Sequence, residues 1–400
     1  MMDQPEIRPT ATFRLASRLQ GLKQSDILVL MRECRRRRAA GQRILDLSVG
    51  EPDLATPDHV RAAAASAMDE GHTRYTTPSG MPQLRGAISR ALAEEGLPYL
   101  VREVIATCGA TGGLSLALQA LLSAGDEVVM AAPYYPDHRS QVVLAGGKTE
   151  IVTTTARDGF KLTPKSLRSR LSPRSRVLLL NNPVNPTGVV YTKEELEGLT
   201  QTALEANLFI IADEVYSNLV YDGPPFTSVA ALGPEVRRRS VIVRSLSKTY
   251  AMTGFRVGFA AGPQFLIDAM CTVQGLSVVA PSTISQWAAV AALSGPSDAP
   301  RKFHAVLARR WALTMDRLAT LPGVTAAPSR GALFAFLDLG MADTRPFCAR
   351  LLSEHGVALV PGQEFGAPWG VRLSFATAES DVREGLDLIE VALGAEKVAS

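Results

Sequence analysis

The sequence predicts an α/β fold in which helices cover both faces of a mostly parallel sheet, followed by a smaller α+β unit. From residue 100 to 262, short apolar runs alternate with longer segments of helical periodicity, which is the rhythm of βαβ units. After Gly295-Pro296-Ser297 the pattern changes to long helices separated by short strands. We therefore expect a three-layer α/β/α part and a separate small C-terminal part.

The strands and helices follow from the local patterns. Several strand candidates are apolar throughout, which is typical of strands covered on both faces. We expect strands over 104–107, 127–131, 176–180, 208–212, 241–244 and 257–261, with helices over 112–123, 136–145, 193–206 and 263–276. In the C-terminal part we expect helices near 299–320, 344–354 and 379–393 and strands near 333–338, 357–360 and 370–375.

The domain organisation is predicted in three parts. Residues 1–45 form an arm and a helix near 27–40, which has no sheet of its own and is expected to pack with the C-terminal part. Residues 46–295 form the large domain and residues 296–400 the small one.

Composition excludes several classes of protein. The 400 residues carry 42 Lys+Arg against 39 Asp+Glu, a balance that does not favour binding to a nucleic-acid backbone. The four cysteines are far apart and predict neither a metal site nor a disulfide framework. No stretch has the length and hydropathy of an export signal or a membrane span, so we expect a cytoplasmic protein without a membrane partner.

A lysine stands at the end of the strand expected at 241–244, in the run Ser245-Leu-Ser-Lys-Thr-Tyr-Ala-Met-Thr-Gly-Phe-Arg256. Desolvation at such a position lowers the pKa of a lysine and makes its amine available for a Schiff base with an aldehyde. The hydroxyls of Ser245 and Ser247 and the guanidinium of Arg256 suit a phosphate. Lys248 alone is weak evidence, since a surface lysine is the ordinary alternative.

Two further motifs follow neighbouring strands. Asn181-Asn-Pro-Val-Asn-Pro-Thr-Gly188 forms a rigid loop after the strand at 176–180, where open α/β sheets bind ligands. Asp213 ends the apolar run at 208–212, and a buried carboxylate there requires a cationic partner. A pyridinium nitrogen is such a partner, and pyridoxal phosphate also needs a lysine for its aldehyde and a cradle for its phosphate.

These motifs resemble the fold-type I pyridoxal-phosphate enzymes, specifically the class I and II aminotransferases of the bacterial aspartate/aromatic group. The resemblance runs from about Leu47-Ser-Val-Gly-Glu-Pro-Asp53 to Arg372-Leu-Ser-Phe-Ala376. It implies an enzyme that moves the α-amino group of an L-amino acid to a 2-oxo acid by a ping-pong mechanism through the pyridoxamine form of the cofactor. It implies no metal.

The resemblance also implies roles for single residues. Lys248 would bind the cofactor aldehyde and move a proton between the substrate Cα and the cofactor C4′, and Asp213 would pair with the pyridine nitrogen. The pair Asn185 and Tyr216 would hydrogen-bond the phenolic oxygen, and Tyr135 would stack on the ring. The phosphate would be held by Ser245, Ser247, Arg256 and the helix-opening turn Gly109, Ala110 and Thr111.

Substrate and partner contacts are implied in the same way. Arg372 resembles the arginine that clamps the substrate α-carboxylate, with Asn185 beside it, and Gly50 resembles the glycine whose backbone lies against the substrate. Tyr75 resembles the tyrosine that reaches the phosphate of the neighbouring subunit, which implies a homodimer.

The substrate side chain is where the sequence departs from relatives that act on acidic substrates. One type has an arginine in the stretch that reads Cys271-Thr-Val-Gln-Gly-Leu-Ser-Val-Val279 here, and another has a lysine where this chain has Thr111. We therefore expect a donor with a neutral or aromatic side chain, with Lys23 as a candidate substitute charge. A carbon–sulfur β-lyase, or a protein that binds the cofactor without catalysis, stays as the alternative.

Overall fold

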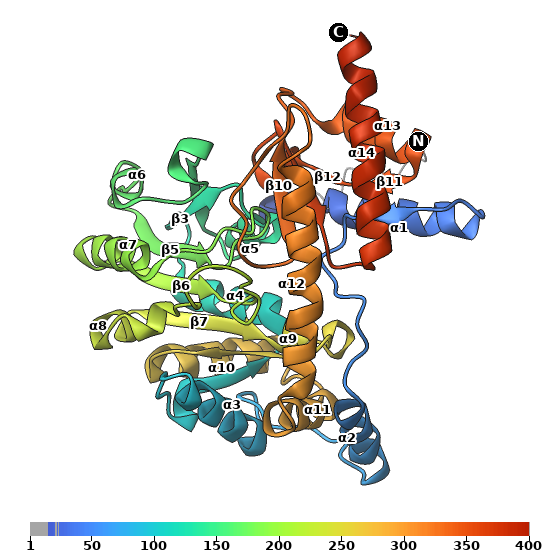
Figure 1. The fold of residues 1–400 in the computed structure, drawn as a ribbon. Helices are drawn as coiled ribbons and strands as arrows, with labels where there is room; N and C mark the ends of the chain where they lie inside the picture. Colours follow the sequence, from blue (N-terminus) through green and yellow to red (C-terminus); the bar gives the residue numbers. More distant parts are fainter. Residues whose placement is uncertain (1–14, 21, 23, 400) are drawn as a thin grey trace.

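We describe the protein from a computed structural model that covers residues 15–20, 22 and 24–399 (Figure 1). Its central feature is a seven-stranded sheet that is parallel except for one strand. That strand, β8, is antiparallel to both of its neighbours. The strand order is β2 (Val104–Thr107), β8 (Gly258–Ala261), β7 (Ser240–Ser245), β6 (Phe209–Asp213), β5 (Ser175–Asn181), β3 (Glu127–Ala132) and β4 (Lys148–Thr153).

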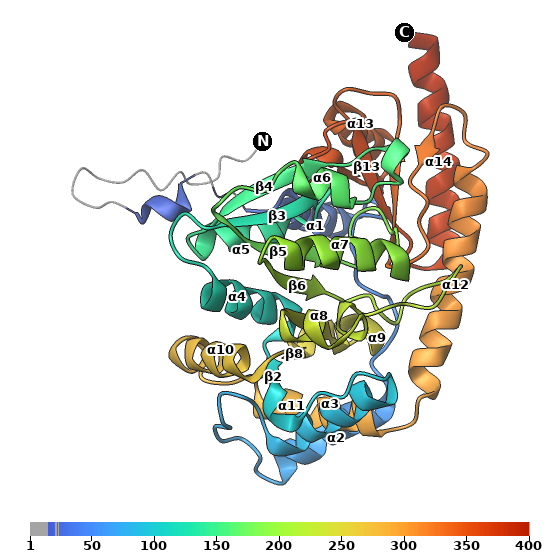
Figure 2. The ribbon, with the colours of Figure 1, turned by 90° about the vertical axis from the view of Figure 1, so that its left-hand side faces the viewer.

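Alternating side chains of each central strand enter two different apolar cores. In β5, Val177 and Leu179 pack into the core of one face, and Leu178 and Leu180 into the core of the other. The first face is covered by α4 (Gly109–Leu121), α5 (Pro136–Leu144) and α10 (Gln264–Ser277), the second by α7 (Lys193–Glu205) and α8 (Pro234–Arg238). Figure 2 shows α4 and α10 on one side of the sheet and α7 and α8 on the other. The expected α/β/α layering is confirmed.

A group of helices lies beside the β2 edge of the sheet. It consists of α2 (Asp58–Asp69), α3 (Pro82–Glu94) and α11 (Thr283–Ser294), and α11 contacts both of the others. A further short helix, α6 (Pro164–Arg168), precedes β5 and packs on α7. The strand and helix patterns of the sequence did not predict α2, α3 or α11.

A second, smaller sheet is antiparallel and is built from the C-terminal part of the chain. Its strand order is β12 (Val360–Pro361), β13 (Gly370–Ser374), β10 (Phe334–Asp338) and β9 (Thr325–Ala326). Close to it, β1 (Leu45–Asp46) pairs in parallel with β11 (Val357–Ala358). The accompanying helices are α12 (Asp298–Leu318), α13 (Arg345–His355) and α14 (Glu379–Ala399).

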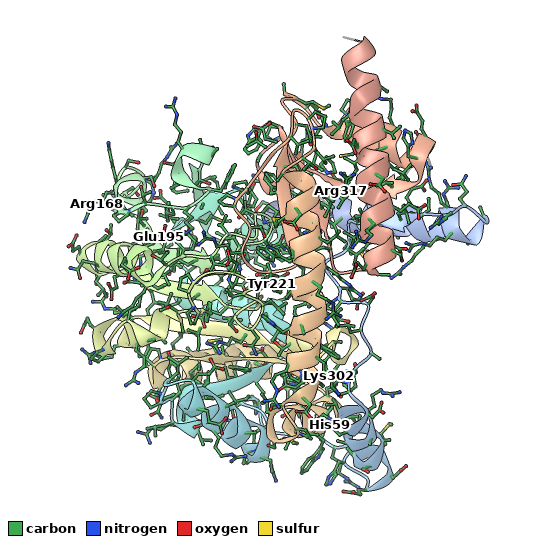
Figure 3. All side chains as sticks on the ribbon, in the orientation of Figure 1. His59, Arg168, Glu195, Tyr221, Lys302 and Arg317 are labelled. Atoms are coloured by element: carbon green, nitrogen blue, oxygen red, sulfur yellow. The ribbon has the colours of Figure 1, made fainter. Side chains whose placement is uncertain are left out.

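The long helix α12 connects the two parts of the molecule, running from the α11 end up to the second sheet (Figure 1). Near its C-terminal end, Arg317 lies between α12 and α14 (Figure 3) and donates to Asp387 at 2.7 Å and Glu390 at 2.9 Å. Arg310, two turns earlier, is buried and donates to both carboxylate oxygens of Asp53, at 2.7 and 3.1 Å. These pairs fix α12 to segments from both ends of the chain.

Helix α1 (Asp26–Ala39) packs against the C-terminal part. Cys34 is fully buried in a small cluster with Ile44, Leu352 and Ala358. At the other end of α1, the Glu364 carboxylate accepts hydrogen bonds from the Ser25 hydroxyl at 3.1 Å and the Asp26 backbone at 3.0 Å. The division of the chain at residues 45 and 295 stays a prediction.

Two features of the main sheet departed from simple expectation, and both have a physical reason. β4 was not predicted because it is an edge strand whose Lys148 and Glu150 interrupt the apolar run typical of covered strands. The reversed direction of β8 follows from long-range pairing, which a local pattern does not encode.

Within the described part of the chain, no helix is long and apolar enough to cross a lipid bilayer.

Candidate active site

A cavity of about 430 Å³ lies at the carboxyl ends of β5, β6 and β7. It receives side chains from both sheets and from α1. Most of the predicted site residues line it, namely Gly50, Ala110, Thr111, Tyr135, Asn185, Asp213, Tyr216, Ser245, Ser247, Lys248, Arg256 and Arg372. Residues more than 300 positions apart in sequence therefore meet at one place.

Lys248 belongs to α9 (Leu246–Thr249), a single turn that follows β7 directly. Its Nζ donates a hydrogen bond to the backbone oxygen of Gly50 at 2.7 Å. Burial lowers the pKa of Lys248 to about 8, with further lowering by the nearby cations Arg256 and Arg372 and an opposing effect of Glu51. A substantial fraction of the amine is thus neutral and nucleophilic close to physiological pH.

The backbone at Gly50 passes very close to an aromatic ring. A Cβ atom at this position would overlap the ring carbons of Phe334. No side chain larger than hydrogen fits there because of the Phe334 ring, and the expected contact of Gly50 with the substrate stays a prediction.

An anion-binding turn forms where β2 leads into α4. Gly109 has φ +69°, a left-handed conformation that favours glycine, and the Arg256 guanidinium lies against it. The backbone N–H groups at the start of α4 are not used within the helix and can hold an anion. Because Arg256 adds a positive charge at the same place, the turn suits a phosphate.

Two serines lie beside this turn. The Ser245 hydroxyl caps α9 by accepting from the Ser247 backbone at 3.1 Å, and it donates to the Ser247 hydroxyl at 2.9 Å. Both serines are buried. The strand beside them, β8, approaches the turn closely, since a Cβ on Gly258 would lie 2.9 Å from the Gly109 carbonyl carbon and 3.0 Å from the Ala110 nitrogen.

Asp213 is buried at the end of β6 and its carboxylate has two partners. One oxygen lies 2.8 Å from the Nε2 of His138, and the other accepts from the Val215 backbone at 3.2 Å. The sequence did not single out His138, although it stands one helical turn after Tyr135 and on the helix that follows β3. That spacing was the only available signal.

Asn185, Tyr216 and Tyr135 surround the centre of the cavity. The Asn185 side-chain oxygen accepts from Arg372 at 3.0 Å, and burial raises the pKa of both tyrosine hydroxyls. The Tyr135 hydroxyl donates to Asp137 at 2.7 Å, while its ring meets the His138 ring edge-on at 5.3 Å. Both tyrosines are therefore neutral, and the ring of Tyr135 is held in place.

Arg372 enters the cavity from β13 of the second sheet. Burial lowers its pKa to about 10, so the guanidinium remains protonated at neutral pH. It donates to the Asn185 side chain and, at 2.6 Å, to the backbone oxygen of Ser48, while its buried Nε has no partner. Among the ion pairs of the described residues none involves Arg372, so a buried positive charge faces the cavity without a carboxylate.

Three predicted residues are not part of the cavity lining, and one of them, Gly109, lies against Arg256 at its edge. Tyr75 is 90% exposed and lies on the surface of the chain. Lys23 is outside the described residues.

Comparison with known proteins identifies the family of the chain. The model of the family "Aminotransferase class I and II" matches residues 42–389. The chain belongs to the class I and II aminotransferases.

Relatives cover nearly the whole chain. An aspartate aminotransferase of Geobacillus stearothermophilus is 39% identical over 95% of this chain and 97% of its own length. An aspartate/prephenate aminotransferase of Thermus thermophilus is 37% identical over 95% of this chain and 99% of its own. The crystal structure of the Rhizobium meliloti aspartate aminotransferase superposes with a TM-score of 0.91 at 35% identity, covering 96% of this chain and 99% of that one. The protein is thus a pyridoxal-phosphate-dependent aminotransferase, and transfer is favoured over the lyase and non-catalytic alternatives.

The residues present fit pyridoxal phosphate. The cavity has the size of a typical cofactor or ligand pocket, roughly 300 to 1,000 Å³. Its lining supplies an amine with lowered pKa for the aldehyde, a turn with an arginine for the phosphate and a buried carboxylate for the pyridine nitrogen. The donor set therefore suits the aldehyde, the phosphate and the pyridine nitrogen of the cofactor.

The lowered pKa of Lys248 predicts the pH dependence of its reaction with an aldehyde. As the pH rises through 8, the amine changes from mainly protonated to mainly neutral and reactive. The rate of covalent loading of the apoprotein with pyridoxal phosphate should therefore rise with a midpoint near the lysine pKa of about 8. Stopped-flow absorbance between pH 6 and 11 measures this rate. Lys248→Arg, which keeps the charge, should give no adduct that borohydride can reduce. A midpoint near 10.5, the ordinary pKa of a lysine, would contradict the burial of Lys248.

The close approach of β8 to the phosphate turn predicts the effect of a single methyl group. Gly258→Ala places a Cβ 2.7 Å from the Arg244 carbonyl oxygen and against the turn, so it should lower the free energy of unfolding by about 1 to 3 kcal/mol and weaken cofactor binding. Gly254→Ala is the matched control, because no atom lies within 4 Å of its added Cβ. Urea titration and cofactor titration give both quantities. Equal stability of the two variants would show that the turn accommodates the added methyl group without cost, and this would contradict the prediction.

Proposed function

We propose that this aminotransferase takes its amino group from an acidic L-amino acid, with aspartate as the preferred donor, and passes it to a 2-oxo acid. The choice of an acidic donor rests on the names of the relatives. Three proteins that are 34–39% identical over at least 94% of this chain are named aspartate aminotransferases. These names favour an acidic donor over the neutral or aromatic one predicted from the missing basic residues.

Lys248 and Asp213 form the reacting centre in this proposal. When bound, pyridoxal phosphate supplies an aldehyde that captures the substrate amine and a ring that accepts the electron pair released at Cα. With a pKa of about 8, Lys248 can both accept and return a proton at Nζ near neutral pH. Asp213, fixed by His138, would keep the pyridine nitrogen protonated because a buried carboxylate stabilises a neighbouring positive charge.

The remaining residues bind and orient. The turn at Gly109, Ala110 and Thr111 would hold the phosphate together with Ser245, Ser247 and Arg256. Asn185 and Tyr216 would hydrogen-bond the phenolic oxygen, and Tyr135 would cover the ring. All of these except Gly109 line the cavity, and Gly109 lies against Arg256.

Arg372 would bind the substrate α-carboxylate. A buried guanidinium without an anionic partner is unfavourable until a carboxylate arrives, and a bidentate pair then satisfies it. The Gly50 backbone packs directly against the Phe334 ring beside it.

A specific observation favours the second candidate, a neutral or aromatic donor. The described residues of the cavity lining include three basic side chains, Lys248, Arg256 and Arg372. Each of them already has a proposed role, in binding the aldehyde, the phosphate and the α-carboxylate respectively. Toward α1 the lining is apolar, with Ile27, Leu28 and Met31. A distal carboxylate would need a positive charge from elsewhere.

A donor panel decides between these candidates. Purified holoenzyme is mixed with L-aspartate, L-glutamate, L-phenylalanine or L-alanine without any oxo acid, and the absorbance of the lysine-bound cofactor is followed. The proposal expects aspartate to convert the cofactor fastest, with stoichiometric oxaloacetate formed. Faster conversion by phenylalanine would select the second candidate. L-Cystathionine, added as a fifth donor, tests the carbon–sulfur lyase, because its Cβ carries a thiolate leaving group that the other donors lack. Release of homocysteine, ammonia and pyruvate from it over many turnovers would indicate a lyase.

Asp213→Asn is the matched variant for the reacting centre, since it keeps the shape of the side chain and removes its charge. We expect the half-reaction with the best donor to slow by about 100-fold or more, as for removal of an acid–base partner. Thermal unfolding checks that the variant is folded. A near-normal rate would mean that the carboxylate does not hold the pyridine nitrogen.

We also propose a homodimer in which Tyr75 contacts the partner's cofactor phosphate. The support is that Tyr75, Leu276 and Val278 are exposed by 90%, 86% and 52%. The segments that carry them are in contact, because the Gln274 side chain donates to the Pro78 backbone oxygen.

The dimer predicts the behaviour of Tyr75→Phe. Loss of one hydrogen bond to a charged phosphate should weaken cofactor binding about tenfold, whereas in a monomer this exposed hydroxyl would have no effect. Sedimentation equilibrium supplies the mass. A species of 42.8 kDa whose affinity for the cofactor is unchanged by the Tyr75→Phe substitution would contradict the dimer.

A further inference from the structure

Arg372 differs from the other buried arginines in how its charge is stabilised. Arg244 is paired with Glu214 at 2.9 Å and Glu95 at 2.6 Å, and Arg310 is paired with Asp53 at 2.7 Å. The acceptors of Arg372 are an amide oxygen and a backbone oxygen, both neutral. Some other group must stabilise this cation in the absence of substrate.

Two phenylalanine rings lie against the guanidinium. The Cζ of Arg372 is 4.3 Å from the ring centre of Phe334 and 5.0 Å from that of Phe365. Both rings are almost completely buried, and cation–π attraction is strongest where water is excluded. Phe334 comes from β10 and Phe365 from the 3₁₀ turn Gly362–Phe365, so the two rings belong to different segments.

Each ring is itself held by neighbours. Phe334 lies close to the Gly50 backbone and meets the Tyr216 ring edge-on at 5.9 Å. Phe365 meets Phe336 edge-on at 6.0 Å. The rings therefore cannot turn away without displacing other residues of the site.

Aromatic rings stabilise a guanidinium without using its N–H donors. A carboxylate partner, as Arg244 and Arg310 have, would occupy those donors and neutralise the charge. The arrangement at Arg372 leaves the Nε–H unpaired and the positive charge unbalanced, which is what an incoming carboxylate requires.

We propose that Phe334 and Phe365 are positioning residues for substrate recognition. They fix the Arg372 guanidinium and keep its free N–H groups available to the substrate α-carboxylate. This inference rests on the proposed role of Arg372, and the residues act through that side chain.

The test uses two probes that differ only at the carboxylate. 2-Aminoisobutyrate has an α-carboxylate and no hydrogen on Cα, so it binds without being transaminated, whereas tert-butylamine has a methyl group where the carboxylate stands. Dissociation constants come from the absorbance change of the holoenzyme. The variants are Phe334→Leu and Phe365→Leu, which keep an apolar side chain and remove the π face.

Phe375→Leu is the matched control. Phe375 is equally buried, follows β13, and packs its ring against Tyr221 at 5.9 Å. We expect each of the two test variants to weaken 2-aminoisobutyrate binding about tenfold and to change tert-butylamine binding less than about twofold. The control should change neither constant. Thermal midpoints of all three variants record any general loss of packing.

The outcomes separate this inference from the proposed function. Arg372→Leu, which removes the charge, should abolish the discrimination between the probes, and if it does not, the proposed role of Arg372 fails. If Arg372→Leu abolishes it while Phe334→Leu and Phe365→Leu retain it, the inference alone is overturned. Equal weakening of both probes, or the same selective loss in Phe375→Leu, also overturns it, because the rings would then only fill the core.

Discussion

The parallel register of β5, β6 and β7 is the constraint on which the site depends. Asn181 pairs with Asp213 across β5 and β6, and Asp213 pairs with Val243 across β6 and β7, so the three strands end side by side. The loop with Asn185, the carboxylate of Asp213 and the turn with Lys248 must then emerge at one edge of the sheet. The close-packed apolar cores on both faces hold these strands in register, and with them the relative positions of the three side chains.

Burial sets the electrostatics around the basic side chains of the cavity. It lowers the pKa of both Lys248 and Arg372, and the nearby Arg256 and Arg372 lower that of Lys248 further. The Arg256 guanidinium lies against the turn at Gly109. In the proposed function these side chains serve two anions, a phosphate at the turn and a carboxylate at Arg372. Among the described lining residues, Asp213 places the one deeply buried negative charge at the end of β6, next to His138.

Local sequence was sufficient for most of this arrangement, since each motif follows an apolar strand and parallel strands end at a common edge. The positions of Asn185, Asp213, Ser245 and Lys248 were predictable for that reason. His138 was not, because its importance comes from a contact 75 residues away. Nor was Phe334, whose ring meets Arg372 only because β10 and β13 are neighbours in a sheet. Contacts between distant segments are set by tertiary packing, and the periodicity of a single sequence does not predict them.

The two ends of an acidic donor would meet very different surroundings. The proposed site for the α-carboxylate is deeply buried, because Phe334, Phe365 and Asn185 surround Arg372. Elsewhere the cavity is lined by Ile27, Leu28 and Met31 of α1, and the start of α1 is joined to the 3₁₀ turn Gly362–Phe365 by the hydrogen bond from Ser25 to Glu364. In the proposed function the reaction depends on Lys248 and Asp213, whereas the choice of donor side chain depends on the wall formed by α1. A family can therefore keep one chemistry while its members differ in donor, because the residues that change the donor do not touch the reacting atoms.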